Sequence, residues 1–308
     1  MKRSNKCGLL AAILASLLAL PEAFAADPNI ERQASAFLQE RYETVVGTRS
    51  NLLSQLHLSG PKADPYIQHL GTPFIYLIAG LKAVGPTTFS VVEASSELVL
   101  TGARDFTGPT GLGMVMARFC YIAVLADGER QAIANEFSKI PPSALGGMAV
   151  WTWSVPPFEG HDREITFYAT LSDTVFVVAN DRQDLLDALD AMAKQPNIAN
   201  SSTDSASESV RKHGYWAQSD PRQRSWKLLP FPAVKIELWT RLDDDRLILK
   251  VVPEDPSTQL PAAESVVGLI QLQRRQAGIL EATLPLRASP TMMYIFQAMS
   301  LLGYAVVL

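Results

Sequence analysis

Apolar residues recur every three or four positions in the first part of the chain, as an amphipathic helix requires. The longest such pattern runs from Ile30 to about Leu56, and a shorter one covers residues 65–70. The stretch "PFIYLIAGLKAVG", residues 73–85, begins with proline and ends with glycine, as helices do. These patterns predict an N-terminal helical segment over residues 26–86. The last helix is too short to cross a bilayer and is expected to pack in the core.

The pattern changes after residue 86. Helical spacing predicts one helix at Glu129–Ile140, ended by two prolines, and another that begins near Asp181. Around them, apolar runs and alternation predict strands in "SELVLTGARDF", "GLGMVMARFCYIAVLADG", "GMAVWTWSV", "REITFYATLS" and "TVFVVAN". Residues 87–194 are therefore predicted to form an α+β unit, in which helices pack on one face of an antiparallel sheet.

A stretch rich in Ser, Asn and Asp, residues 195–212, has almost no large apolar residue, which is typical of a linker. Beyond it, residues 213–308 show a similar order of elements. A strand hairpin crosses three aspartates, a helix is expected in "PAAESVVGLIQLQRRQ", the strand "GILEATLPL" follows, and a final helix ends at Leu302. This order predicts a second, similar α+β unit, without a residue-by-residue repeat.

The run from "FCYIAVLADGERQAIANEF" to "VKIELWTRLDDDRLILKVV", within about residues 118–286, resembles a group of exported bacterial proteins of unknown function built from two such units. The resemblance lies in the apolar pattern and the order of elements, without a diagnostic motif. It implies a fold and a compartment, and it implies no activity.

The first 25 residues have the three parts of a secretory signal peptide: basic residues, an apolar run and a small-residue triplet that ends at Ala25. Cleavage is expected between Ala25 and Ala26, which predicts a periplasmic or secreted protein. The leader carries three basic residues and one acidic residue, so the mature chain has 24 basic and 30 acidic residues and a net charge of −6. An acidic surface repels phosphate backbones, which argues against nucleic acid as a partner.

Only Cys120 remains after cleavage, so no disulfide is expected within the mature chain. Near the other end, residues 291–308 carry no charge, and two interpretations compete. The segment could anchor the protein in a membrane, or it could form a helix and strand buried in the fold. Its polar residues favour burial.

Four aspartates, Asp181, Asp184, Asp187 and Asp190, lie three residues apart. A magnesium site is one interpretation, but it needs carboxylates that converge with a second set of ligands, and no second acidic run of that kind occurs. The alternative is the solvent-facing side of an amphipathic helix, with the first acids capping its free amides. The sequence favours this alternative and predicts neither a metal nor a cofactor.

Catalytic signals are sparse. His161, Asp162 and Glu164 gather acid/base groups in one predicted loop before a strand and are the candidates for a hydrolase site. The sequence shows no zinc motif, nucleophile elbow or phosphate-binding loop. Without such a motif, the sequence leans toward a protein that is not an enzyme.

Trp151 and Trp153 lie two residues apart on a predicted strand and therefore on the same face. Two indoles side by side suit a platform on which a sugar or a peptide stacks. Core packing is the favoured alternative, because the residues that alternate with them are smaller.

Together these patterns predict an exported protein of unknown activity that binds or has a structural role in the cell envelope. Its expected partner is a protein, a glycan or an apolar ligand. One rival hypothesis is an exported hydrolase with a site near His161. The other is a carrier whose cavity is lined by Phe167, Phe176 and Leu189.

Overall fold

The computed structural model describes residues 28–49, 69–104, 118–156, 164–193, 214–223, 229, 231–241, 246–258, 266–267 and 270–285. Several predicted features lie outside the described residues: the signal peptide, the linker, the three-aspartate turn, the final helix and the uncharged C-terminal segment.

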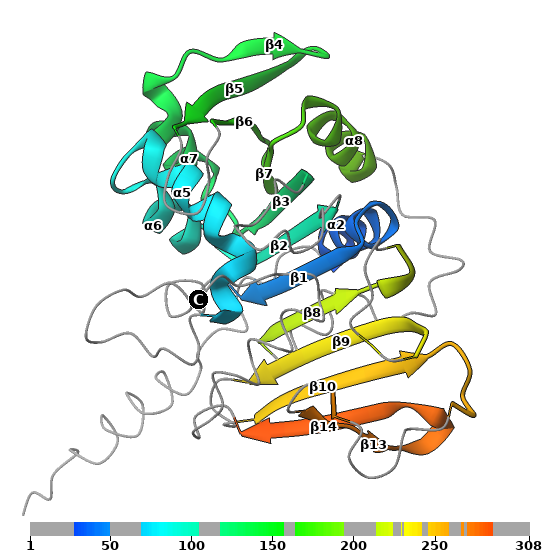
Figure 1. Ribbon diagram of the computed structural model, residues 1–308. Coiled ribbons are helices and arrows are strands. Elements are labelled where there is room, and N and C mark those ends of the chain that lie inside the picture. The colour runs from blue at the N-terminus through cyan, green and yellow to red at the C-terminus, as the bar shows by residue number, and fades with distance from the viewer. Residues whose placement is uncertain are drawn as a thin grey trace, which may run out of the picture.

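A twelve-stranded antiparallel sheet organises the described part of the chain (Figure 1). The strand order is β13-β14-β10-β9-β8-β1-β2-β3-β7-β6-β5-β4, and β11 and β12 form a separate pair. The α+β class and the antiparallel pairing are thus confirmed. The strands are β1 (Thr44–Arg49), β2 (Ser96–Arg104), β3 (Arg118–Leu125), β4 (Ser143–Leu145), β5 (Met148–Val155), β6 (Ile165–Leu171), β7 (Val175–Ala179), β8 (Tyr215–Ser219), β9 (Ala233–Arg241), β10 (Arg246–Pro253), β11 (Val266–Val267), β12 (Ile270–Gln271), β13 (Gln273–Arg274) and β14 (Leu280–Pro285).

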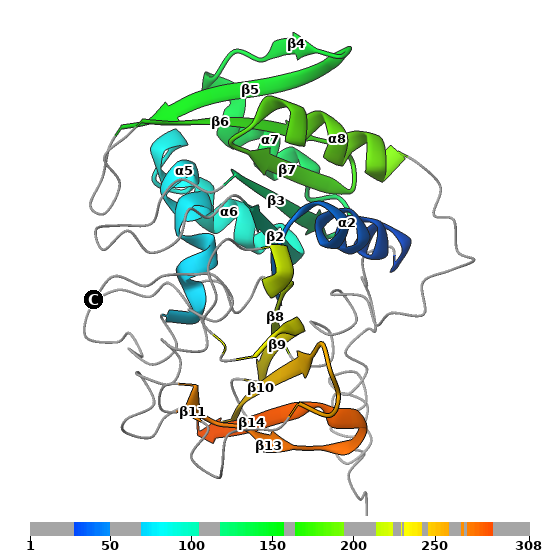
Figure 2. The ribbon, with the colours of Figure 1, turned by 45° about the vertical axis from the view of Figure 1, so that its right-hand side comes forward.

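Helices lie on both faces of this sheet, whereas the sequence predicted one helical face (Figure 2). Both faces need cover because β3 and β7 are apolar and buried along almost their whole length. On one side lie α2 (Pro28–Arg41) and α8 (Arg182–Ala193), which define the α8 face. On the other side lie α5 (Ile75–Val84), α6 (Thr88–Ala94) and α7 (Arg130–Glu136), which define the α5 face. Four short 3₁₀ helices complete the described set: η1 (His69–Phe74), η2 (Phe137–Lys139), η3 (Pro221–Gln223) and η4 (Gln276–Gly278).

The N-terminal segment is not wholly helical. α2 ends at Arg41, and the predicted continuation of this helix is wrong over Thr44–Arg49, which form β1. The run "TVVGTR" is rich in β-branched residues, which favour strands. β1 pairs with β2 on one side and β8 on the other. It therefore joins parts of the chain on both sides of the predicted linker in one sheet, and the domain division itself stays a prediction.

The helix predicted in "PAAESVVGLIQLQRRQ" is also wrong where the structure describes it. Val266–Val267, Ile270–Gln271 and Gln273–Arg274 form strands β11, β12 and β13. The physical reason is a period of two: Leu272 is buried, and its neighbours Gln271 and Gln273 are exposed.

None of the described helices is by itself long and apolar enough to cross a membrane. α5 and α6 meet the requirements of length and composition only as a pair, and that pair is bent by 118°. The residues of α5 that face the sheet are buried, in agreement with the predicted core position of this helix.

On the α8 face, Gly102 of β2 lets α2 approach the sheet. A Cβ atom at this position would lie 2.6 Å from the Tyr42 ring and 2.9 Å from Leu38. We therefore expect Gly102→Ala to lower the free energy of unfolding by about 1–3 kcal/mol, the usual cost of overpacking a core. Urea denaturation measures this loss. Ala149→Val, which adds volume at an exposed strand position, is the control and should be nearly neutral. Equal stability of Gly102→Ala and wild type would contradict the close approach.

Candidate binding face

The first aspartate of the series caps α8, as predicted. The amides of Gln183 and Asp184 donate to Asp181 Oδ1 at 2.9 and 3.1 Å. Asp181 therefore satisfies two of the amide groups that the first turn of a helix leaves without partners.

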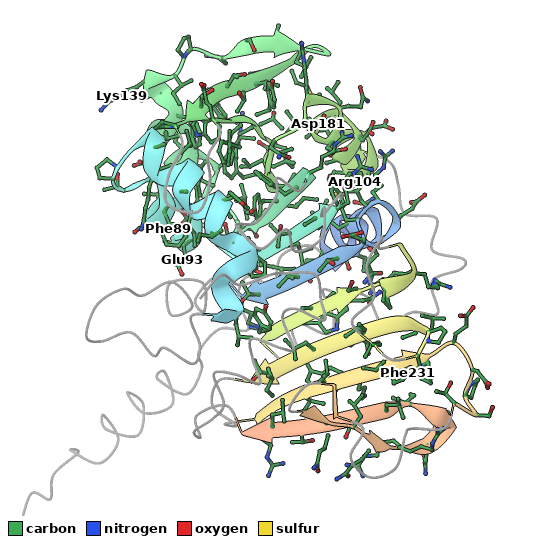
Figure 3. The ribbon with its side chains drawn as sticks, viewed as in Figure 1. Phe89, Glu93, Arg104, Lys139, Asp181 and Phe231 are labelled. Atoms are coloured by element: carbon green, nitrogen blue, oxygen red, sulfur yellow. The ribbon has the colours of Figure 1, made fainter. Side chains whose placement is uncertain are left out.

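Asp184 is not solvent-facing, and the prediction is wrong for this residue. Its side chain is 1% exposed, and its Oδ1 lies 2.7 Å from an Arg104 guanidinium nitrogen and 3.2 Å from one of Arg118. The two arginines are register partners at the ends of β2 and β3, where α8 begins. Figure 3 shows Arg104 and Asp181 together at this end of the sheet. Arg118 also pairs with Asp181.

The other two aspartates behave differently. Asp187 forms an ion pair with Arg41 at the end of α2, and Asp190 is exposed. The aspartates therefore connect α8 to β2, β3 and α2. Within the described residues, no group of three or more His, Cys, Asp or Glu side chains is placed to hold a metal ion.

Burial shifts the pKa values of several acids in this cluster toward the uncharged form. Burial raises the pKa of Asp184, and the nearby guanidiniums of Arg104 and Arg118 oppose that shift. Burial also raises the pKa of Tyr42 and of Cys120 well above their usual ranges. A buried, protonated thiol is a poor nucleophile. None of these pKa shifts makes a group a better nucleophile. We therefore assign the network a structural role, which is to hold α8 against the sheet.

The predicted hydrolase residues are not brought together by the described structure. His161 and Asp162 lie outside the described residues, and Glu164 is an exposed residue just before β6. The hypothesis of a site near His161 therefore stays a prediction.

Trp151 and Trp153 share one face of β5, as predicted, and that face is the α5 face. The centroid of the Phe137 ring lies 4.8 Å from that of Trp151 and 5.4 Å from that of Trp153. Trp153 Nε1 also donates a hydrogen bond to the carbonyl oxygen of Gly80, at 2.9 Å. Both indoles are half-buried against α5 and η2. This placement agrees with core packing, and a role in stacking stays a prediction.

The three residues of the predicted carrier cavity do not meet. Phe167 and Phe176 are buried on the α5 face, among other aromatic rings. Leu189 belongs to α8 and packs on the opposite side of the sheet. The sheet separates these side chains, so they cannot line one cavity.

A part of the α8 face carries no described α-helix. α2 packs on β1, β2 and β3, and α8 packs on β6 and β7, but no described helix packs comparably on β10 or β14 (Figure 1). On these strands the residues that point to the α5 face are buried, whereas those of the α8 face are only partly buried or exposed. We call this region the open face and define it by Gln218, Lys235, Glu237, Trp239, Ile248, Lys250, Val252, Gln273, Glu281 and Thr283.

Strand register arranges the open face in rows. Gln218 pairs with Glu237, Glu237 with Lys250, Lys250 with Glu281, and Glu281 with Gln273. These five side chains form the polar row, which crosses five strands. A second row consists of Trp216, Trp239, Ile248 and Thr283. In that row Trp216 is buried, and Trp239 is half-buried.

Contacts within the open face fix several of its side chains. The Lys250 ammonium lies 4.2 Å from the centroid of the Trp239 ring, within the range of a cation–π interaction. Lys235 forms an ion pair with Glu237. At the far end of the row, Arg275 Nε lies 3.3 Å from Glu281 Oε1.

The open face was not predicted from the sequence, although one signal for it exists. In "AVKIELWTRL", Lys235, Glu237 and Trp239 alternate with Ile236 and Leu238. Trp239 packs against the edge of the core on this side of the sheet, but it stands among the polar positions of an alternating strand and stays partly exposed, which indicates a surface with a function.

The edges of the sheet are less suited to binding than this face. The outermost described strands have only three residues (β4) and two residues (β13). Pro141 and Pro142 precede β4 and cannot donate ladder hydrogen bonds. Short strands and prolines are the features by which proteins protect sheet edges from further pairing.

No protein-family model matches this chain, and no curated protein has a detectably similar sequence. Three crystal forms of TP0453, a Treponema protein, are similar in structure. Form III has a TM-score of 0.41 and 9% identity and covers 89% of this chain and 99% of that one. For form I the values are 0.40, 8%, 90% and 99%, and for form IV they are 0.38, 11%, 85% and 94%. At these scores the similarity carries no argument about function. Export and the two-unit organisation stay predictions.

Proposed function

We propose that this chain is an exported, non-catalytic binding module of the cell envelope and that its partner docks on the open face. The observation that carries the proposal is the row of polar side chains beside Trp239 on a part of the sheet without a described α-helix. Alternation alone would place small polar residues there, whereas a half-buried tryptophan is a residue that binding surfaces favour.

The other ionisable clusters support the same proposal. Asp184 pairs with Arg104 and Arg118, and these contacts hold α8 to the sheet. Cys120 is buried and protonated. These groups therefore serve the fold, whereas the charged side chains of the polar row lie beside Trp239 on a partly exposed face.

The test combines cell fractionation, which locates the wild-type chain, with a sedimentation assay of the full-length chain and envelope fragments from the bacterium that expresses it. The assay compares wild type with a double variant, Trp239→Ala with Lys250→Ala, which removes the central pair of the open face. We expect wild type to be recovered outside the cytoplasm and to co-sediment with the fragments, and the double variant to lose at least about tenfold in affinity, as at a binding hot spot.

The matched control is Thr152→Ala with Ser154→Ala. Both residues are exposed, and they lie on β5 at the other end of the sheet. This control should bind like wild type. The proposal fails if wild type stays in the cytoplasm, if it does not sediment with the envelope, or if the open-face variant binds as well as wild type.

A further inference from the structure

We propose that the open face binds a neutral glycan chain, which lies along the polar row with sugar rings against Trp239 and Ile248. This inference rests on the proposed function and names the chemical class of its partner.

The chemistry of the polar row is the first argument. From Gln218 to Gln273 the row presents an amide, a carboxylate, an ammonium, a carboxylate and an amide. Strands are spaced about 4.8 Å apart, so these five groups extend over roughly 19 Å. Such a series alternates hydrogen-bond donors and acceptors. Hydroxyl groups, which both donate and accept, can bond to every member of it.

The neighbouring row supplies apolar contacts. Trp239 and Ile248 are register partners and are both half-buried, and they lie directly beside Glu237 and Lys250. A sugar ring has polar hydroxyls at its rim and C–H groups on its faces. An aromatic ring next to hydrogen-bonding groups matches both kinds of surface at once.

Charge on the open face distinguishes a neutral glycan from an anionic one. Lys235 is paired with Glu237, Lys250 lies on the Trp239 ring, and Glu281 is near Arg275. The face contains two lysines, Lys235 and Lys250, and two glutamates, Glu237 and Glu281, so its formal charge is zero. An anionic polymer would gain little electrostatic attraction here, whereas the hydrogen-bonding groups stay in place for neutral hydroxyls.

Composition argues against a protein as the partner. The cores of protein interfaces are depleted in Lys and Glu and enriched in several aromatic residues. The centre of the open face has the opposite character, since Glu237, Lys250 and Glu281 lie in consecutive places of one row. Burying these charges against another protein would carry a desolvation cost that a hydrated glycan largely avoids.

The experiment is calorimetric titration of the full-length chain with three neutral oligosaccharides, cellohexaose, maltohexaose and chitohexaose, and with protease-treated envelope fragments in a sedimentation assay. Heparin serves as the anionic comparison. We expect binding to a neutral oligosaccharide and to the protease-treated fragments. Trp239→Ala should weaken both at least about tenfold, and heparin should bind more weakly than the neutral chain.

Two further variants separate binding from folding. Gln273→Ala changes an exposed residue at the end of the polar row, so it should leave the fold intact while it weakens binding a few-fold. Lys139→Ala changes an exposed lysine on η2, away from the open face, and should bind like wild type (Figure 3).

The outcomes distinguish this inference from the proposed function. If the open-face variants reduce envelope binding but protease treatment abolishes it and no neutral oligosaccharide binds at millimolar concentration, the partner is a protein. The glycan inference is then wrong, and the binding module remains. If heparin binds more tightly than every neutral chain, the glycan is anionic and the inference is again wrong. If no fraction shows binding that depends on the open face, both proposals are overturned.

Discussion

Replacing Phe167 with alanine is expected to lower the free energy of unfolding by about 3–5 kcal/mol, the usual range for removing a buried phenylalanine. Phe167 is fully buried at the centre of the α5 face. Its ring stacks on Trp153 with centroids 5.4 Å apart, and it lies 5.7 Å from the Phe119 ring. On the helix side, a Cβ atom at Gly80 would lie 2.8 Å from the Phe167 ring. This residue therefore joins α5, β3 and β5 through one side chain.

Equilibrium unfolding in urea measures the effect, with the slope of the transition as a check on the denatured state. Phe167→Leu keeps most of the apolar volume and should cost about 1 kcal/mol. If Phe167→Ala cost no more than Phe167→Leu, the surrounding rings would be able to close the cavity, and the described packing would not be the source of stability.

Local signals predict the elements whose partners are near in sequence. The hairpins β6–β7 and β9–β10 were expected from alternation and a connecting turn. α8 was expected from its period, and Asp181 from its position before the first turn. In each case a few consecutive residues contain the physical cause.

The predictions are wrong where the residues that determine the local structure are distant in sequence. β1 is held by residues 98–103 and 215–219, and neither partner is visible in a short window around Thr44. The helical spacing of apolar residues reaches Val45, and it therefore predicts that the helix continues there. Asp184 was assigned to solvent because its own helix has an acidic side, and Arg104 and Arg118, which bury it, come from two strands.

The candidate site shows the same limit. Trp151 and Trp153 were found from spacing, but the sequence could not show that α5 and η2 pack against them. The polar row needs the register of five strands, which only the folded sheet supplies. What the sequence does contain is the single tryptophan at a polar position of β9.

The second large effect is expected at the ion pairs of α8. Arg104→Met keeps an apolar stem over the Tyr42 ring, where the guanidinium now lies 5.3 Å from the ring centroid. It leaves the carboxylate of Asp184 buried with Arg118 at 3.2 Å. Removing one partner of a buried pair costs 3–5 kcal/mol in general, and because Arg118 remains we expect a loss of about 3 kcal/mol at pH 7.

This loss should depend on pH in a defined direction. The folded-state pKa of Asp184 is raised by burial, so its contribution to stability is fully present below the unfolded value of about 3.9. That contribution is lost as pH rises through the folded pKa. Arg104 lowers this pKa, so its removal raises the pKa further and increases the cost of an ionised Asp184. Arg104→Met should therefore destabilise the protein more at pH 7 than at pH 4.

A double-mutant cycle with Asp184→Asn isolates the cause. In the Asp184→Asn background no buried carboxylate is left at this position, so Arg104→Met should cost less and its cost should be the same at pH 4 and pH 7. Other titrating groups are common to all four proteins and cancel in the comparison. Urea denaturation at both pH values provides the measurement. A cost of Arg104→Met that does not change with pH in the wild-type background would show that packing on Tyr42, and not the charge of Asp184, is what Arg104 contributes to the fold.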